Sequence, residues 1–197
     1  MMNGETDSGR VGVNRVSLVR LSLTALFAAL TAAGTFISIP LPFTPVPIVL
    51  QNMFALLAGL TLGPLLGGAA VGLYLLAGAI GLPVFAGASG GLVHLVGPTG
   101  GFLFGYLFSA VLSGLIAGTP VNGVKTPSWR LAIAAFAGML LVYVPGILQL
   151  KAVLGLSWPK ALTVGFTPFI AGDAVKTVIA VVSARGLRKS AAKALNG

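Results

Sequence analysis

One stretch, which makes up about half of this chain, carries no charged side chain. Residues 21–124 hold no Asp, Glu, Lys or Arg, a run of 104 residues in a chain of 197. Ordinary chains carry roughly a quarter of charged residues, which cover the surface that faces water. Here charged residues make up 8% and apolar residues 56%. This pattern excludes a soluble domain and predicts a chain that folds in a lipid bilayer.

Prolines and glycines divide the apolar sequence into segments of membrane-spanning length. A helix rises about 1.5 Å per residue and the hydrocarbon layer is about 30 Å thick, so one crossing needs roughly 20 residues, and fewer where protein encloses the backbone. Breaks are expected at residues 40–47, 63–64, 81–101, 118–130 and 151–165. The six predicted spans cover residues 16–39, 48–62, 65–80, 102–117, 131–150 and 166–182.

These spans predict an all-α membrane protein consisting of a single bundle of six transmembrane helices. We expect a disordered polar tail over residues 1–13, the bundle over residues 14–184 and a basic cytoplasmic tail over residues 185–197. The first uncharged segment, residues 21–39, is longer than the 7–15 residues of the apolar region of a signal peptide. We therefore interpret it as a retained helix.

Basic residues lie mainly on one predicted side of the membrane. With the N-terminus in the cytoplasm, the outer side holds only Lys151 and Lys160. The inner side holds Arg10, Arg15, Arg20, Lys125, Arg130, Arg185, Arg188, Lys189 and Lys193. Because cytoplasmic segments carry the excess of Lys and Arg, both termini are predicted to be cytoplasmic. Trp129 and Trp158 lie next to span ends, where aromatic side chains anchor at the membrane surface.

Charge and reactive side chains exclude several classes of function. The net charge is +9, but the basic residues cluster at termini and connectors without the continuous stripe of a nucleic-acid binder, so no nucleic-acid partner is expected. The chain has no cysteine and one histidine, so no metal site and no cofactor are expected. Asp173 is the one carboxylate inside the predicted bundle, which leaves no base and nucleophile set for an enzyme.

Asp173 and Lys176 both lie inside the sixth predicted span. A charged residue at the centre of a helix in lipid costs about 2.5 to 3.5 kcal/mol on insertion scales. Residues three apart share a helix face, so both side chains can point into the bundle. One interpretation is a structural pair that neutralises itself. The other is a binding site for a ligand with N–H donors and an anionic or carbonyl group, because buried ionisable groups in membranes line substrate paths.

Two predicted outer loops, one stiff with proline and one rich in glycine, have a composition that suits loops closing over a ligand. One holds four prolines within residues 40–47, and the other is rich in glycine over residues 81–101, including Gly87. Phe43 and Phe85 in these loops would supply apolar walls, and Gln51 an amide donor and acceptor. Each aromatic side chain could equally face the lipid or pack in the core. The loops are also compatible with simple tight turns. His94 fits either a packing role or a ligand contact.

Small residues recur along the first predicted span. Ala25, Ala29 and Ala33 lie four residues apart, which places them on one helix face. Small side chains let another helix approach closely, and packing is what drives helix association in lipid. The stripe therefore predicts either packing inside the bundle or docking to a separate membrane protein.

Four motifs in register resemble one known family. They are Pro42-Phe-Thr-Pro45-Val-Pro47 followed by Gln51, Gly81-Leu-Pro-Val-Phe85-Ala-Gly87, Gly97-Pro-Thr-Gly-Gly101, and Pro168-Phe-Ile-Ala-Gly-Asp173-Ala-Val-Lys176. In order and over nearly the whole chain they resemble the BioY family, the biotin-binding S-components of energy-coupling factor (ECF) transporters. The connector over residues 118–130 and the two tails lie outside the motifs.

The resemblance implies a multi-pass protein of the bacterial cytoplasmic membrane whose bundle is the substrate-binding domain. It implies high-affinity capture of biotin from outside and uptake together with a transmembrane T-component and two ATP-binding subunits. In the family an Asp and a Lys of the last span contact biotin, and these positions match Asp173 and Lys176. An AxxxA stripe of the first span faces the T-component in the family, and it matches Ala25, Ala29 and Ala33.

Biotin combines two ureido N–H donors, a carbonyl, an apolar ring and chain, and a carboxylate. We hypothesise that Asp173 accepts hydrogen bonds from the ureido N–H groups, while Lys176 contacts either the ureido oxygen or the carboxylate. The chain contains no nucleotide-binding motif, so partners would supply the energy for uptake. The rival hypothesis is a stand-alone secondary carrier for a small organic solute, with Asp173 as proton acceptor.

Overall fold

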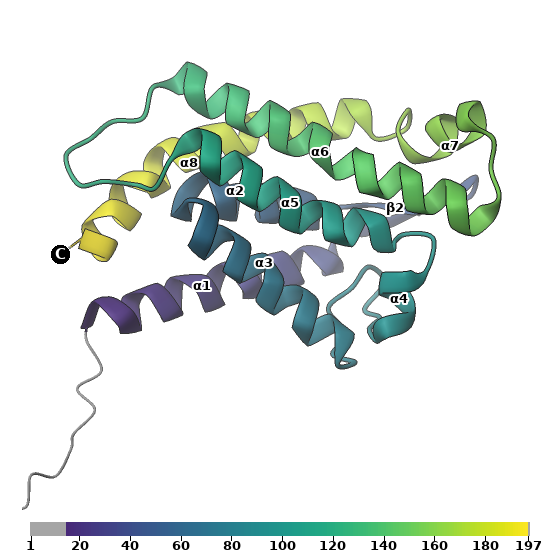
Figure 1. The fold of residues 1–197 in the computed structure, drawn as a ribbon, viewed down its shortest axis with the longest axis horizontal. Helices are drawn as coiled ribbons and strands as arrows, with labels where there is room; N and C mark the ends of the chain where they lie inside the picture. The colour runs from purple at the N-terminus through teal and green to yellow at the C-terminus, as the bar shows by residue number, and fades with distance from the viewer. Residues whose placement is uncertain (1–14, 197) are drawn as a thin grey trace, which may run out of the picture.

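The computed structural model describes residues 15–196 as a bundle of apolar helices with a short hairpin at one end (Figure 1). The helices of the bundle pack side by side (Figure 1). In chain order the elements are α1 (Arg15–Ala33), the 3₁₀ turn η1 (Gly34–Phe36), β1 (Ser38–Leu41), β2 (Thr44–Val49), α2 (Gln51–Leu62), α3 (Pro64–Ala79), α4 (Leu92–Val96), α5 (Gly100–Ala117), α6 (Ser128–Leu154), α7 (Trp158–Gly165) and α8 (Ile170–Asn196).

Helix α2 lies at the centre of the bundle. All of its residues except Phe54 are buried, and it packs against α1, α3, α5, α6 and α8. Its close approach to α5 depends on Gly59, because a Cβ there would lie 2.1 Å from the carbonyl oxygen of Ala110. Helix α3 crosses at the same point, where Gly67 lies against the backbone of Gly59. The three helices therefore pack backbone to backbone, which stabilises helices within lipid.

The proline-rich segment forms a β-hairpin, so the prediction of an all-α chain was wrong here. Strands β1 and β2 pair antiparallel from Ser38 opposite Val49 to Leu41 opposite Thr44, with an irregularity between Ile39 and Leu41. The prolines keep the backbone extended and remove N–H donors, which prevents a helix. Both strands of a two-stranded sheet are edge strands, and edge strands tolerate proline. The segment is therefore extended rather than a simple loop.

The helices differ in how well they match the predicted spans. In the described part of the chain, Val16–Phe36, Gly100–Ala117 and Ser128–Leu154 are long and apolar enough to cross a membrane, and the pair α7 and α8, bent by 51°, adds a fourth candidate. Helices α2 and α3 have 12 and 16 residues, about 18 and 24 Å at 1.5 Å per residue. Because α2 is enclosed by other helices, it does not need to match the lipid thickness by itself.

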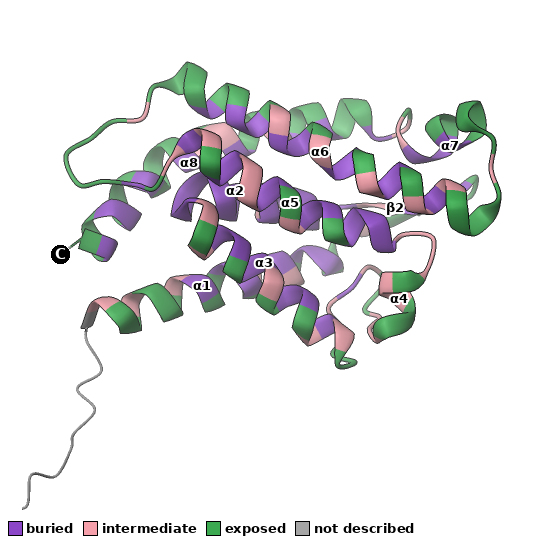
Figure 2. Ribbon diagram, viewed as in Figure 1, coloured by how far each residue is buried: buried purple, intermediate pink, exposed green. Residues whose placement is uncertain are grey.

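Exposed apolar side chains face outward from α1, α3, α5, α6 and α8 (Figure 2). They include Leu65, Ile80, Phe136 and Val178, each between 62% and 85% exposed. An exposed apolar surface of this extent is stable in lipid and not in water. The surface therefore agrees with the composition of the chain.

The two ends of the bundle carry different segments. The hairpin, α4 and α7 lie at one end, while the start of α1, the connector between α5 and α6 and the C-terminal end of α8 lie at the other (Figure 1). The segments that the sequence assigns to the outer side thus share one end. The predicted polar tail over residues 1–13 lies outside the described residues, and the predicted basic tail continues α8 as helix through Asn196.

Candidate functional site

Four polar side chains from three helices form a buried cluster around Asp173. The Lys176 ammonium donates to Asp173 Oδ1 at 2.8 Å, and Asn52 Nδ2 donates to the same oxygen at 2.9 Å. The Tyr143 hydroxyl donates to Asp173 Oδ2, and Lys176 Nζ also donates to Asn52 Oδ1 at 3.3 Å. Helices α2, α6 and α8 are therefore joined through one carboxylate.

The cluster is closed to solvent, and most of its hydrogen-bond donors and acceptors have partners within the protein. Asp173, Lys176, Asn52 and Tyr143 are each 6% or 7% exposed. A carboxylate offers about four acceptor sites and an ammonium three donors. Three of the acceptor sites of Asp173 and two of the donors of Lys176 are used within the protein. One acceptor and one donor remain, so the cluster can take a ligand that presents both an N–H and an oxygen.

The ion pair lies at the start of α8. Helix α8 begins at Ile170, and Asp173 lies in its first turn. A carboxylate near a helix N-terminus is stabilised by the free N–H groups and the helix dipole. Thr177 closes the turn by donating its hydroxyl to the Asp173 carbonyl at 2.6 Å. The structure confirms that both side chains are buried.

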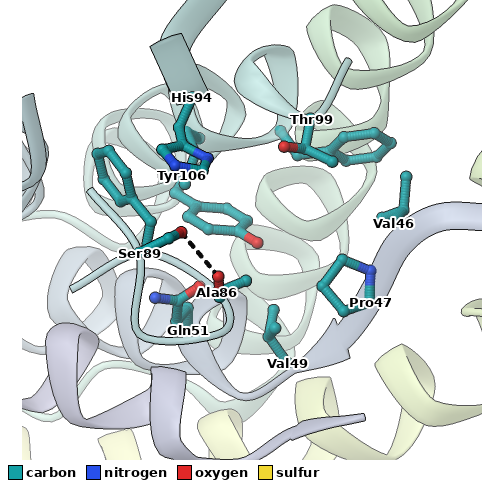
Figure 3. Close-up of a pocket in the computed structure, with 12 residues that line it drawn as sticks. Val46, Pro47, Val49, Gln51, Ala86, Ser89, His94, Thr99 and Tyr106 are labelled. Carbon is teal, nitrogen blue, oxygen red and sulfur yellow. Dashed lines mark hydrogen bonds between the residues drawn. The ribbon is translucent and has the colours of Figure 1, made fainter. Parts of the chain in front are cut away.

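Two small cavities lie between this cluster and the hairpin end of the bundle. One, of about 20 Å³, reaches Asn52, Asp173 and Lys176. The other, of about 50 Å³, reaches Gln51 and His94 (Figure 3). Both are lined by Val46, Pro47, Val49, Phe102 and Tyr106. The shared walls make them two ends of one site, polar at each end and apolar between.

The roof of this site consists of the hairpin and the loop between α3 and α5. Phe85 fixes the loop: its ring packs on Gly78, where a Cβ would lie 2.1 Å away, and lies edge-on to Tyr74 with centroids 5.6 Å apart. Gln149 of α6 donates to the carbonyl oxygens of Leu95 and Gly97, both at 2.8 Å. A few specific contacts therefore hold the roof on the bundle.

The structure brings most of the predicted site residues together. Asp173 and Lys176 line the smaller cavity, and Gln51 and Phe85 the larger one. Gln51 Nε2 donates to the Val84 carbonyl at 2.8 Å, whereas its buried Oε1 has no partner among the described residues, which leaves an acceptor at the cavity. His94 lines the same cavity and lies edge-on to Phe85 at 6.1 Å (Figure 3).

Two predicted residues are not placed at the cavities. Phe43 lies at the tip of the hairpin, between β1 and β2, and is 60% exposed. Gly87 lies in the roof loop with φ of +73°, where a Cβ would meet nothing within 4 Å. A positive φ favours glycine, so this residue serves the turn. The neighbouring Ala86 and Ser89 line the cavity instead.

Three residues of the site were missed by the sequence analysis. Asn52 follows Gln51 directly, and Tyr143 and Tyr106 lie in the middle of predicted spans. A polar or hydroxyl-bearing side chain within an apolar span is a signal of an internal contact, because its polar group needs a partner in lipid. The sequence contains this signal, but it does not show that Asn52 and Tyr143 meet the same carboxylate.

The alanine stripe and an apolar groove lie on the outer surface. Ala25, Ala29 and Ala33 are all exposed on α1, so they do not pack inside the bundle. Between α6 and α8, a groove of about 460 Å³ reaches the cluster from outside and touches Tyr143 and Asp173. It is open to the lipid and otherwise almost wholly apolar. Among residues 15–196, no group of three His, Cys, Asp or Glu side chains could hold a metal ion.

The fold defines a multi-pass membrane protein with two small, roofed cavities at one end of its bundle. The sequence matches the model of the BioY family over residues 8–193. It is 43% identical to "Biotin transporter BioY" of Rhizobium etli, covering 85% of this chain and 91% of that one, and 41% identical to the protein of the same name from Thermotoga maritima, covering 86% and 96%. The chain therefore belongs to the BioY family.

A solved structure has the same fold. It is described as the S-component for biotin from an ECF-type ABC transporter, with a TM-score of 0.79 and 31% sequence identity over 89% of this chain and 94% of that one. The family resemblance seen in the sequence motifs is thus confirmed by two independent comparisons. A membrane location is consistent with the apolar helices described above.

The cluster makes a prediction about stability. Asp173→Leu leaves the buried Lys176 charge without its partner, so we expect a loss of about 3–5 kcal/mol in the free energy of unfolding, and Lys176→Met should cost a similar amount. The double variant removes both charges and should recover most of the loss. Thermal unfolding of the purified variants in detergent measures this. Additive losses in the double variant would contradict coupling between the two charges.

Proposed function

We propose that this chain is the biotin-binding S-component of an ECF transporter, which captures biotin at the outer face for uptake into the cell. The observation that carries the proposal is the enclosed cluster of Asp173, Lys176, Asn52 and Tyr143 next to the roofed cavities. The names of the relatives and of the structural neighbour support biotin as the ligand. Transport rather than enzymatic chemistry is the activity of such a protein.

The chemistry of biotin matches the two ends of the site. The ureido ring presents two N–H donors and one oxygen acceptor. Asp173 has one free acceptor position for one N–H group and Lys176 one free donor position for the oxygen, so the second N–H group needs another acceptor. The unpartnered Oε1 of Gln51 and the ring of His94 lie at the other end. Phe102 and Tyr106 provide the wall between them, suited to the apolar ring and chain.

Binding requires the roof to move. Pockets for small organic ligands enclose roughly 300–1,000 Å³, whereas the two cavities measure about 50 and 20 Å³. The hairpin and the loop carrying α4 are the segments that can lift, because proline and glycine limit their regular hydrogen bonding to the bundle. In this proposal Phe85 and Gln149 hold the closed position.

The membrane arrangement that we propose has six crossings with both termini in the cytoplasm. The gathering of the N-terminal start of α1 and the end of α8 at one end of the bundle supports it (Figure 1). Lys151 and Trp158 at the opposite end form a cation–π contact at 5.1 Å, which suits the membrane surface. The short α2 then crosses within the protein interior, whereas α3 exposes apolar side chains such as Leu65 on its outer face.

The partners that we propose are a transmembrane T-component and two ATP-binding subunits. The chain has no nucleotide-binding motif, so reorientation in the membrane needs energy from such subunits. The exposed stripe of Ala25, Ala29 and Ala33 is the surface that we propose for the T-component. A proton-driven carrier is disfavoured, because Asp173 is already engaged by Lys176 in an ion pair at 2.8 Å.

Titration of the purified protein with biotin tests the site. Asp173→Asn and Lys176→Met should each weaken biotin binding by at least about 10-fold, because each removes a charged hydrogen-bond partner worth about 1.5–3 kcal/mol. Lys160→Met, an exposed lysine outside the cavities, is the matched control and should bind as the parent does. Biotin methyl ester separates the two roles of Lys176, since only a carboxylate contact is lost on esterification.

Parent-like affinity in both Asp173→Asn and Lys176→Met would show that the pair is structural and would remove the proposed site. A folded protein that binds no biotin at all, in any variant, would instead contradict the proposed ligand. The two results are distinguishable because unfolding is measured on the same samples.

The alanine stripe makes a separate prediction. Ala29→Leu adds a bulky side chain to the surface on which close helix packing would occur, so we expect the variant to lose copurification with the T-component and to keep its biotin affinity. Ala132→Leu, at an exposed alanine of α6, is the control. Affinity purification of the tagged chain coexpressed with its transporter subunits measures this. Equal recovery of the T-component with both variants would contradict the proposed interface.

A further inference from the structure

A second groove lies at the end of the bundle opposite to the cavities. It has a volume of about 660 Å³ and lies between the connector over residues 120–128 and the last turns of α8. Figure 1 shows the connector as an open loop beside the end of α8. Both segments fall outside the four motifs of the family resemblance, and the proposed biotin site does not use either of them.

The groove is lined by cations that have no acidic partner among residues 15–196. Arg185, Lys189 and Lys193 are exposed and follow one another at intervals of four residues, which places them on one face of α8, and Lys125 lines the groove from the connector. Asp173 is the one carboxylate among residues 15–196, more than three helical turns from Arg185. The described residues therefore leave this positive charge without a neutralising carboxylate.

A buried arginine forms the floor and fixes the walls. Arg188 is 7% exposed and donates through its guanidinium to the carbonyl oxygens of Leu60, Ala117 and Gly118. Its Nε donates to Thr126 Oγ1 of the connector at 3.1 Å. The C-terminal ends of α2 and α5, the connector and α8 are thus held together by one side chain. The groove is a built feature of the fold, and its floor adds a further positive charge.

The walls of the groove are also apolar. Val121 and Val124 of the connector are 52% and 68% exposed, and Leu131 and Ala192 line the inner side. Trp129, 66% exposed, lies in the first turn of α6 and follows Ser128, which lines the groove. Aromatic side chains are enriched at the membrane surface. A free phosphate ion needs only the cations. An amphiphile with an anionic head and acyl chains uses both kinds of wall.

We propose that this groove binds the headgroup of an anionic phospholipid, with the phosphodiester near Arg185, Lys189 and Lys193 and the glycerol and first acyl carbons against Val121 and Val124. Basic pockets at the cytoplasmic ends of membrane helices suit such headgroups. The location agrees with the proposed cytoplasmic side, but the lipid site itself stands independently of biotin as the ligand.

The test uses the purified full-length chain in detergent and three probes: dioctanoyl phosphatidylglycerol, dioctanoyl phosphatidylcholine and inorganic phosphate. The anionic lipid should raise the melting temperature in a saturable manner, while the zwitterionic lipid and inorganic phosphate should not. The triple variant Arg185→Gln, Lys189→Gln, Lys193→Gln should bind the anionic lipid at least about 10-fold more weakly, because each cation near a phospholipid headgroup contributes to attraction. The affinity for biotin should stay unchanged.

A matched control variant and a single-residue variant complete the test. Lys151→Gln combined with Lys160→Gln removes cations from the opposite end and should leave lipid binding unchanged. Lys125→Gln alone changes only the connector and should weaken lipid binding by a smaller factor, which covers the case of a triple variant that does not fold. Arg188 is kept, because its removal would strip four hydrogen bonds from the fold.

Three results would overturn the proposal. Equal stabilisation by phosphatidylcholine would indicate a site for acyl chains without charge recognition, and equal stabilisation by inorganic phosphate would indicate a simple anion site. The third result is parent-like lipid binding by both the triple variant and Lys125→Gln, together with loss of copurification of the coexpressed transporter subunits. This result would assign the groove to a protein partner.

Discussion

The buried carboxylate of Asp173 is the group on which the rest of the structure depends. Burying it in a bilayer is unfavourable unless charge and hydrogen bonds compensate. Lys176 supplies the charge from the same helix, and Asn52 and Tyr143 supply hydrogen bonds from α2 and α6. These three helices therefore meet at a fixed point. Beside it, one acceptor position of Asp173 and one donor position of Lys176 remain free at the cavity.

Proline and glycine shape the remaining parts of the site. The central glycines, such as Gly59, let α2 pack backbone to backbone with α3 and α5, which frees α2 to carry Gln51 and Asn52 at its outer end. The prolines of β1 and β2 produce an extended flap above these residues. Glycine and proline thus produce both a tightly packed bundle and a weakly bonded roof. This division suits a protein that must bind and release a ligand.

Much of the fold could be predicted because lipid imposes simple rules. The run without charge, the length of a crossing and the proline and glycine breaks placed α2, α3 and α5 within three residues of their observed bounds. In contrast, α1 ends six residues before its predicted span does, and α8 continues 14 residues beyond its predicted span. The hairpin was missed because prolines exclude a helix without indicating which strands pair. The start of α8 at Ile170 was not predicted, because it depends on the bend after α7, for which the sequence has no strong signal.

The site was predictable in part for a similar reason. Asp173 and Lys176 stand out as charges in an apolar segment, and Gln51 and Phe85 were found through the motifs. Asn52, Tyr143 and Tyr106 became visible only in three dimensions, since each is separated by many residues from the carboxylate or cavity that it serves. Phe43, expected at the site, lies at the exposed hairpin tip, where local sequence could not distinguish a wall residue from a lipid contact.

An experimental structure of the chain with biotin bound tests the central claim most directly. The account predicts the ureido ring within hydrogen-bond distance of Asp173 and Lys176, with the hairpin and the α4 loop displaced to enlarge the two cavities into one. Biotin seated in the apolar groove between α6 and α8, with the hydrogen bonds of Asp173 to Asn52, Tyr143 and Lys176 unchanged and the roof closed, would contradict it.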